Sequence, residues 1–405
     1  MPYVARPGRE NSAPDTEGVH DFSLLLGGPF FQLLLRSRAI LPTFDLLVRR
    51  IVVLALVPWV PLLVLTLVAG TAFGDAVAVP FLKDIEVHAR FLVAIPLLVL
   101  AERVTHRRLR PVFDQFVDRD LIAPCDLPAF DEILARARRW RNSYIAEALM
   151  IVASFAMTFL VWRPHIVLNV ATWYARPGAG GVELTSAGWW YAWAALPVQR
   201  FLMFRWLYRL AILYVVLARI SRLPLRIVPT HPDRVGGLSF LGALGTSLQP
   251  LHMAITSLVS GYIANRILFD GRRLEDFYLM GGSVLGTLLV LTLLPLLFFA
   301  GPLAGARREG LKEYGMLAQR YVQAFRGRWV SPVLSGGEAL LGSADVQSLA
   351  DLSTSYDIVR EMQTIPVGLR QSVLLLAVAA VPLIPLLLTQ FSLATLLEKA
   401  FKFIV

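Results

Sequence analysis

The stretch VPFLKDIEVHARFLVAIPLLVLAERVTHRRLRP, residues 79–111, decides the fold because it determines how often the chain crosses a membrane. Its uninterrupted apolar run, residues 91–101, is only eleven residues long. At the helical rise of 1.5 Å per residue this run covers roughly 16 Å, about half of a ~30 Å hydrocarbon core. A crossing must therefore begin near Phe81 and include four ionisable side chains, Asp84, Glu86, His88 and Arg90.

The composition of the whole chain indicates a membrane protein. Hydrophobic residues make up 56% of the 405 residues, charged residues make up 17%, and the mean hydropathy is +0.60. This balance lies outside that of ordinary soluble domains. The net charge of +10 does not indicate a nucleic-acid partner, because the basic residues flank apolar runs. The single cysteine, Cys125, excludes an intramolecular disulfide and a CxxC metal site.

Long apolar runs predict seven membrane-spanning helices. They cover residues 51–69, 81–102, 144–162, 189–218, 237–269, 277–300 and 372–389. With the N-terminus inside, the inner segments hold 28 of the 39 Lys and Arg residues. Without the second crossing, every later loop would lie on the other side of the membrane. Because the Lys and Arg bias of short loops sets orientation, we expect an all-α integral membrane protein with its N-terminus inside and its C-terminus outside.

The segments outside the spans divide the chain further, with interfacial helices expected at both ends. FSLLLGGPFFQLLL, residues 22–35, and the amphipathic tail, residues 391–405, are too short to cross and are expected to lie at the membrane surface. The expected organisation is a tail with an interfacial segment (1–50), two spans (51–101), a basic cytoplasmic segment (102–143), four spans (144–300), a helical cytoplasmic segment (301–371), and a last span with its tail (372–405).

The ionisable residues of the second span form one group of candidate site residues. Asp84 and His88 are four residues apart and share a helix face, as do Glu86 and Arg90 on another face. Two intrahelical pairs would lower the cost of burying these charges. Alternatively, imidazole beside carboxylates could relay protons or bind a cation. Counting helical rise along the spans places His252 of the fifth span at the same depth as His88, so the two could act together. Alternatively, His252 is a hydrogen-bonded histidine of the packed interior.

The fourth span carries arginines within its apolar sequence. Arg200, Arg205 and Arg209 are spaced by five and four residues, which differs from the every-third-residue repeat of a voltage sensor. By depth, Arg205 falls near Glu102 or Glu147. Structural ion pairs are one interpretation, and a basic lining of an anion pathway is the other.

A loop between the fourth and fifth spans has the composition of a motif. In RIVPTHPDRVGGLSFLG, residues 226–242, two prolines stop helix formation, and Gly236 and Gly237 permit positive φ. His231, Asp233 and Arg234 gather at the turn. We interpret it as a rigid cytoplasmic turn in which Asp233 caps the next helix and Arg234 meets lipid phosphate, or as a gate that contacts a ligand. The loop lacks the four ligands that zinc requires, and no metal site is predicted.

Three segments carry a resemblance to other proteins. DFSLLLGGPFFQLLL, VPFLKDIEVHARFLVAIPLLVLAE and VPTHPDRVGGLSFLG are similar to segments of a widespread group of bacterial multi-pass membrane proteins that carry a PTHPDRxGGL loop. That resemblance implies a bacterial inner membrane. It implies no activity, so no functional role is transferred to a residue.

The sequence leaves three functional hypotheses. The first is a channel or transporter for an ion or small solute, with polar residues of the second, fourth and fifth spans along the route. The second is a membrane scaffold or sensor that engages a partner through its basic cytoplasmic segments. The third is an enzyme acting on lipid. The sequence does not support it, because it contains no HExxH or GxSxG motif and no recognisable catalytic residue or cofactor motif. Expected partners are anionic phospholipid, a second copy of the chain and a cytoplasmic protein.

Overall fold

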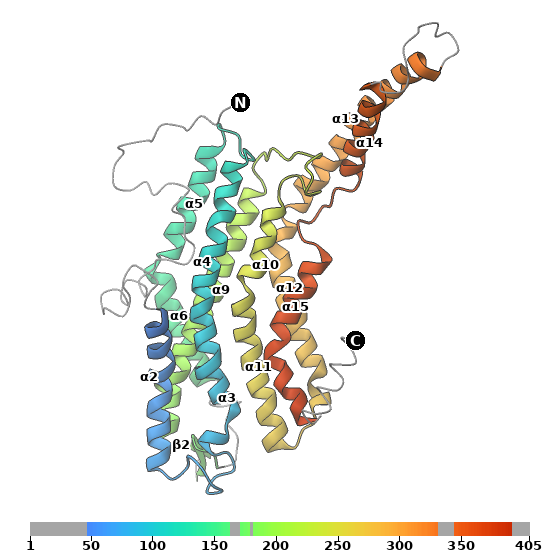
Figure 1. Cartoon of the computed structure of the whole chain (residues 1–405). Helices are drawn as coiled ribbons and strands as arrows, with labels where there is room; N and C mark the ends of the chain where they lie inside the picture. Colours follow the sequence, from blue (N-terminus) through green and yellow to red (C-terminus); the bar gives the residue numbers. More distant parts are fainter. Residues whose placement is uncertain (1–46, 163–170, 179–180, 331–343, 391–405) are drawn as a thin grey trace.

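The computed structural model describes residues 47–162, 171–178, 181–330 and 344–390. These residues are mainly helical and form an elongated bundle (Figure 1). The strands β1 (Ala175–Gly178) and β2 (Gly181–Leu184) lie at one end of the bundle, here named the strand end. At the other end, α13 (Ala300–Phe325) and α14 (Ala344–Arg360) project away from it. These two helices are named the stem, and their end of the bundle is the stem end.

The remaining elements follow in chain order. The longer helices are α2 (Leu47–Val68), α4 (Ile95–Asp118), α5 (Leu127–Arg141), α6 (Tyr144–Ala156), α9 (Leu196–Ile220), α11 (Gln249–Asp270), α12 (Tyr278–Leu297) and α15 (Leu369–Ala380). The short α-helices are α3 (Ile85–His88), α8 (Ser186–Trp190) and α10 (Ala243–Ser247). The 3₁₀ turns are η3 (Phe81–Lys83), η7 (Ser239–Gly242), η8 (Leu274–Phe277) and η10 (Val381–Thr389), and the π-helical turns are η4 (Ala89–Ala94), η5 (Met157–Trp162), η6 (Tyr191–Ala195) and η9 (Arg326–Val330).

Several helices are long and apolar enough to cross a membrane. Four of those described qualify, and they cover Leu47–Val68, Ser186–Ile220, Leu274–Leu297 and Arg370–Thr389. The pair α5 and α6, bent by 45° at its break, gives a fifth candidate. The first four coincide with predicted spans, whereas the fifth joins α6, in the predicted span 144–162, to α5, which lies in the segment 102–143 predicted to be cytoplasmic. In α2, α12 and α15, about four fifths of each apolar window lies on the surface, as expected for helices that face lipid.

The other two predicted spans are helical but less apolar, and their bounds differ from the prediction. The helix of residues 81–102 begins after η3 and continues past Glu102 to Asp118. The segment 237–269 is broken at Leu248, because Pro250 lies in the first turn of α11 and favours a helix start there. Much of both segments lies in the interior of the bundle, where other helices bury Asp84, Glu102 and His252.

The packing of α11 against α3, η4 and α4 forms the centre of the bundle. Gly261 of α11 permits the closest approach, because a β-carbon there would lie 2.8 Å from the β-carbon of Ala89. Further toward the stem end, the Thr105 hydroxyl donates to the Ser247 carbonyl at 2.8 Å, and the Trp206 indole donates to the Leu98 carbonyl at 3.1 Å. One apolar cluster continues along these helices to Leu303 of α13.

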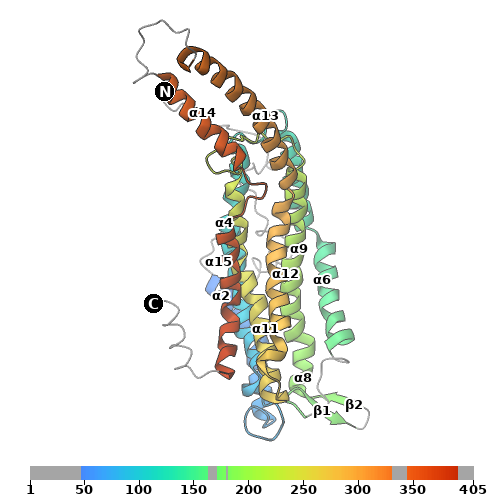
Figure 2. The ribbon, with the colours of Figure 1, turned by 90° about the vertical axis from the view of Figure 1, so that its right-hand side faces the viewer.

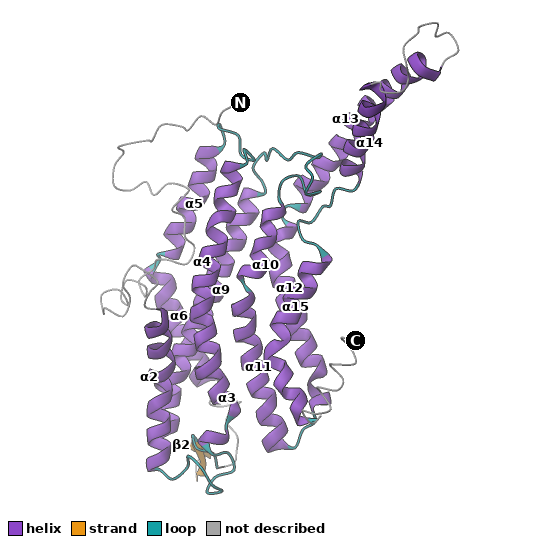
Figure 3. Ribbon diagram, viewed as in Figure 1, coloured by secondary structure: helices purple, strands orange, loops and turns teal. Residues whose placement is uncertain are grey.

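The antiparallel pair of β1 and β2 departs from the all-α prediction (Figure 3). The segment just before β1 pairs with the loop that follows α2, through a bridge between Thr172 and Val79. Trp173 is fully buried beneath this loop, and its indole donates to Asp84 at 2.8 Å. The hairpin therefore closes the strand end of the bundle over Asp84.

Helices of the two predicted inner segments, 102–143 and 301–371, have different main neighbours. The helix α5 packs against α9, whereas α14 packs chiefly against α13 (Figure 2). The stem follows α12 closely in the chain, because α13 begins only three residues after α12 ends, and it leaves the bundle at an angle to α12 (Figures 1 and 2). The predicted interfacial segments 22–35 and 391–405 lie outside the described residues.

Candidate functional site

A buried charge cluster surrounds Glu102 of α4. Its carboxylate lies 2.5 Å from Arg50 of α2, 2.8 Å from Arg209 and 3.4 Å from Arg205, both of α9. All four side chains are at least nine-tenths buried. The predicted pairing of Arg205 with Glu102 is confirmed, and Glu147 of α6 adds a second buried carboxylate that attracts Arg205. The cluster joins three helices and compensates charges that would be costly alone.

Arg200 is separate from this cluster. It lies on α9 toward the strand end, and its guanidinium donates to the hydroxyl of Thr158 on η5. Arg200 and Thr158 are both buried. The structure therefore places the predicted arginines of the fourth span in two different environments.

Asp84 and His88 have different partners, so the predicted pair between them is wrong. The Asp84 carboxylate caps α3 by accepting from the Val87 amide at 3.1 Å. It also accepts from the Trp173 indole at 2.8 Å and from the Asn265 amide at 2.7 Å. His88 accepts at Nδ1 from the Trp59 indole at 3.1 Å. Because Asp84 lies at the helix start, its side chain satisfies free backbone N–H groups instead of reaching down the helix.

The second predicted pair in this span is present. The Arg90 guanidinium donates to the Glu86 carboxylate, one turn earlier on the same helix. Glu86 remains about one quarter exposed, and Arg90 lies deeper, at 14%. The pair therefore has its carboxylate near the edge of the bundle and its guanidinium closer to the interior.

His252 is far from His88 along α11, which corrects the prediction that the two are level. Gly261, nine residues after His252, lies against Glu86 and Ala89, so it is the part of α11 that lies beside His88. His252 is buried, and its Nε2 lies 3.1 Å from the Thr292 hydroxyl of α12. Its contacts are those of a packing histidine.

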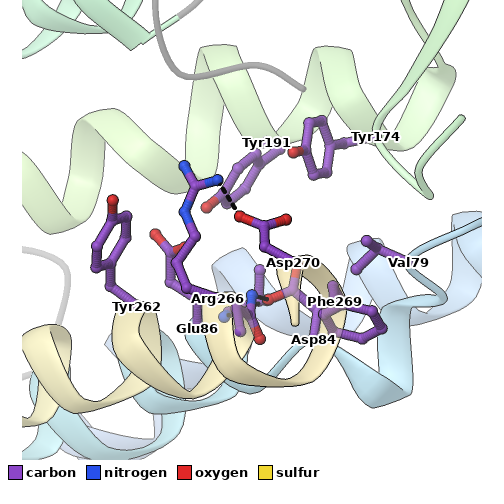
Figure 4. A pocket seen from close by; sticks show the side chains of 11 residues that line it. Val79, Asp84, Glu86, Tyr174, Tyr191, Tyr262, Arg266, Phe269 and Asp270 are labelled. Atoms are coloured by element: carbon purple, nitrogen blue, oxygen red, sulfur yellow. Dashed lines mark hydrogen bonds and ion pairs between the residues drawn. The ribbon is translucent and has the colours of Figure 1, made fainter. Parts of the chain in front are cut away.

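A polar cavity of about 60 Å³ lies at the strand end (Figure 4). Its wall combines α3 and the C-terminal half of α11 with tyrosines contributed by η6 and by the segment before β1. The charged members are Asp84, Glu86, Arg266 and Asp270, and the tyrosines are Tyr174, Tyr191 and Tyr262. Only Asp84 and Glu86 were sequence candidates. The tyrosines were not singled out because tyrosines at the ends of spans usually belong to an aromatic belt.

The loop after α9 is organised around Asp233. One carboxylate oxygen accepts from the amides of Val235 at 2.9 Å and Gly237 at 3.1 Å, and the other accepts from the amide of Ser239 at 3.1 Å. His231 Nδ1 lies 2.8 Å from the same carboxylate. Burial opposes the ionisation of Asp233, but these hydrogen bonds favour the ionised form more strongly, so its pKa lies below the ordinary value. Asp233 accepts from the amide of Ser239, the first residue of η7, but the N-cap residue of that turn is Leu238, so the predicted capping role is met only through this one contact.

Positive φ angles shape the same loop. Arg234 has φ of 57°, Gly236 of 63° and Gly237 of 92°. At Gly236 a β-carbon would lie 2.2 Å from the Ile227 side chain, so a side chain there is excluded. Both glycines are therefore required by the turn itself, as their sequence pattern indicated.

The loop also holds the base of the stem. Pro229 packs against Gly310 of α13, where an added β-carbon would lie 2.6 Å from the Pro229 β-carbon and 3.0 Å from Val359 of α14. The Arg234 guanidinium lies 2.9 Å from Glu361, and the Arg234 carbonyl accepts from the Gln363 amide at 2.7 Å. Arg234 thus pairs with Glu361 while its side chain stays 56% exposed, and its predicted contact with lipid phosphate stays a prediction. We name these contacts of residues 229–236 with both stem helices the clamp.

The chain was compared with protein-family models, with curated proteins and with solved structures, and none of them matches it.

Proposed function

We propose that this protein is a scaffold or sensor of the bacterial inner membrane that presents the stem to a cytoplasmic protein partner. The observation that carries the proposal is the clamp. Pro229 and Arg234 fix the base of the stem through Gly310, Val359 and Glu361. The part of the stem beyond Gly315 then projects with little further contact to the bundle. A rigid base with an exposed arm is an arrangement suited to presenting a surface at a defined angle.

The exposed stem surface supports a protein partner. Most residues of α13 after Gly315, and most of α14 before Val359, are exposed. They include several large apolar side chains that are 45–50% exposed, namely Met316, Leu317, Val322 and Val346. Helices in proteins gain most of their stability from packing an apolar face, and a two-helix stem offers each helix only one neighbour. A partner that covers the stem would supply the missing contacts.

The charge pattern supports the orientation used here, with seven crossings and the N-terminus inside. Predicted inner segments 102–143 and 301–371 contain α5 and the stem, which both lie toward the stem end (Figure 1). These two segments hold the largest numbers of Lys and Arg residues among the predicted inner segments. Basic residues at this end favour the cytoplasmic leaflet and contact with anionic phospholipid.

Photo-crosslinking in living cells tests the stem surface. A benzophenone amino acid at Leu317 or Val346 is expected to give an adduct of one discrete mass with one cytoplasmic protein. The matched control is the same amino acid at Leu279, which is 86% exposed on α12 at the strand end and is expected to give no such adduct. Met316→Glu should strongly reduce the Leu317 adduct, because it places a charge in the apolar contact.

Two outcomes of this experiment would contradict the proposal. One is crosslinking at the stem no stronger than at Leu279 while the protein is inserted in the membrane. The other is adducts that form only between two copies of the chain, which would assign the stem to self-association.

A pathway for an ion or small solute is the second candidate function. The observation that favours it is the run of polar groups from the strand-end cavity through Glu86 and Arg90 toward Arg200. Proteoliposomes with wild-type protein, His88→Ala or Arg200→Ala would be assayed for proton and ion flux. A flux that either substitution removes supports this candidate, and equal leak in all three and in empty liposomes contradicts it.

A further inference from the structure

We infer that the strand-end cavity is a binding site for a small ammonium group, carried by a free organic amine or by a lipid headgroup. The inference is independent of the stem. It rests on the size of the cavity, on the sign of its charge and on its tyrosine rings. Each of these is a property of side chains that four segments of the chain bring together.

The size of the cavity limits the ligand to a few heavy atoms. One water molecule needs roughly 10–15 Å³ of such space, so about 60 Å³ corresponds to about four waters. Glu86, Arg266 and Asp270 at the rim are each between one quarter and one third exposed. Asp84 on the inner wall is only 4% exposed. A ligand can therefore enter from the rim and place one small group against Asp84.

The charge of the cavity favours a cation. Its wall holds the carboxylates of Asp84, Glu86 and Asp270 and the guanidinium of Arg266 (Figure 4). Arg90 behind the wall pairs with Glu86, and Arg266 lies 2.5 Å from Asp270. Among these five side chains, three carboxylates face two guanidiniums, and Arg200 lies deeper, behind Arg90. Asp84 is held by three neutral donors, the amides of Val87 and Asn265 and the indole of Trp173. A buried carboxylate with neutral donors is where a bound cation gains most.

The tyrosine rings favour an organic cation over a metal ion. Aromatic faces attract ammonium and guanidinium groups, and Tyr262 already carries the Arg266 guanidinium 5.3 Å from its ring centre. Tyr174 and Tyr191 lie with ring centres 6.2 Å apart on the opposite side of the cavity (Figure 4). Among the described residues, no group of three or more His, Cys, Asp or Glu side chains could hold a metal ion. The chemistry that fits is an ammonium group between a carboxylate and aromatic rings.

Binding of radiolabelled ethanolamine to the purified full-length protein in detergent is the first test. We expect saturable binding that methylammonium displaces and that sodium or potassium at the same concentration does not. Native mass spectrometry of protein extracted from mixed vesicles forms the second arm, and phosphatidylethanolamine should be retained over phosphatidylglycerol if the headgroup is the source. Binding in either arm supports the ammonium site. Binding in neither arm, or equal displacement by sodium, overturns it.

Substitutions locate the bound group. Glu86→Gln should weaken binding roughly tenfold, because it removes a charge from the wall. Asp270→Asn, at the exposed rim, should also weaken binding. It provides a second test of the charge if Glu86→Gln does not fold. Tyr262→Leu should lower the affinity for ethanolamine roughly two- to fivefold, because it removes the aromatic ring. Tyr262→Phe keeps the ring and should leave the affinity unchanged. The control is Glu275→Gln, an exposed carboxylate at the same end that does not line the cavity. Unchanged affinity in Glu86→Gln and Asp270→Asn, with all variants folded, would overturn the inference.

Discussion

The carboxylate of Glu102 lies 2.5 Å from the guanidinium of Arg50, on a neighbouring helix, and both side chains are more than nine-tenths buried. Arg205 and Arg209 approach the same carboxylate, so one anion compensates three buried cations. Removal of that anion would leave three buried guanidiniums close together, with the nearby carboxylate of Glu147 attracting Arg205. This relationship makes Glu102 the most sensitive charged position of the bundle.

Glu102→Gln is expected to lower the free energy of unfolding by about 3–5 kcal/mol, the usual cost of breaking a buried ion pair. The measurement is equilibrium unfolding of the purified protein in mixed micelles. The matched control is Glu132→Gln, which breaks the exposed pair with Arg136 at 2.7 Å on α5. That pair should contribute about 0.3–0.5 kcal/mol. Equal, small losses in the two variants would show that the cluster adds nothing to stability.

Gly310→Ala should disturb the clamp. A β-carbon at Gly310 would lie within 3.0 Å of Pro229 and Val359, and such overpacking typically costs about 1–3 kcal/mol. Spin labels at Cys125, which is exposed, and at a Leu317→Cys substitution would report the distance from the bundle to the stem. We expect this distance distribution to shift or broaden in Gly310→Ala.

Gly305→Ala is the control for the clamp experiment, because a β-carbon at Gly305 of the same helix meets no atom within 4 Å. Its distance distribution should match that of the wild type. A similar response to both substitutions would show that helix propensity, and not contact with Pro229, is responsible.

The Asp233 carboxylate should make the stability of the loop dependent on pH in acid. Its pKa is lowered in the folded protein, so its contribution to stability is complete above the ordinary value of 3.8 and is lost as pH falls through the lower folded value. Asp233→Asn should therefore destabilise the protein by a constant amount at neutral pH, about 1.5–3 kcal/mol for the charged hydrogen bonds. Melting temperatures of the two proteins should converge below about pH 4, whereas Asp118→Asn, at an exposed position, should show no such difference.

The close contact of α11 with α3 and η4 predicts a different result for two glycines. Gly261→Ala places a β-carbon 2.8 Å from that of Ala89 and 3.0 Å from the α-carbon of Glu86, and it should cost about 1–3 kcal/mol. Gly281→Ala on α12 meets no atom within 4 Å and should be neutral or slightly stabilising. Thermal unfolding of both variants in the same detergent makes the comparison. A neutral Gly261→Ala would mean that the helices separate without loss of stability.

The single native cysteine tests the proposed orientation. Cys125 is exposed near the stem end, so a membrane-impermeant maleimide should label it only after cells are permeabilised. In a Cys125→Ser background, a cysteine at Asp75, in the exposed loop at the strand end, should be labelled in intact cells. The reverse pattern would invert the topology, and labelling of both positions in intact cells would contradict an odd number of crossings between residues 75 and 125.

Much of the helical layout could be predicted from the sequence, because a membrane span depends on local composition. The apolar runs located α2, α6 with η5, α9 with α8, α12, and α15 with η10 to within a few residues of their observed bounds, whereas α5 lies in the segment predicted to be cytoplasmic. The ion pair of Glu86 with Arg90 and the pairing of Arg205 with Glu102 followed from helix spacing and from depth. The prediction from depth that His88 and His252 lie at the same level was wrong, because the break at Leu248 shifts α11 relative to a continuous helix.

Length and hydropathy are properties of contiguous residues, so the order of amino acids alone is enough to establish a helical chain with several helices long and apolar enough for a membrane. Only the tertiary structure decided which distant residues meet. It placed Arg50 on Glu102, Trp173 and Asn265 on Asp84, and the loop at Pro229 against the stem. The physical reason is that these contacts depend on how helices rotate and approach one another, which is set by packing over the whole bundle and leaves no local pattern in the sequence.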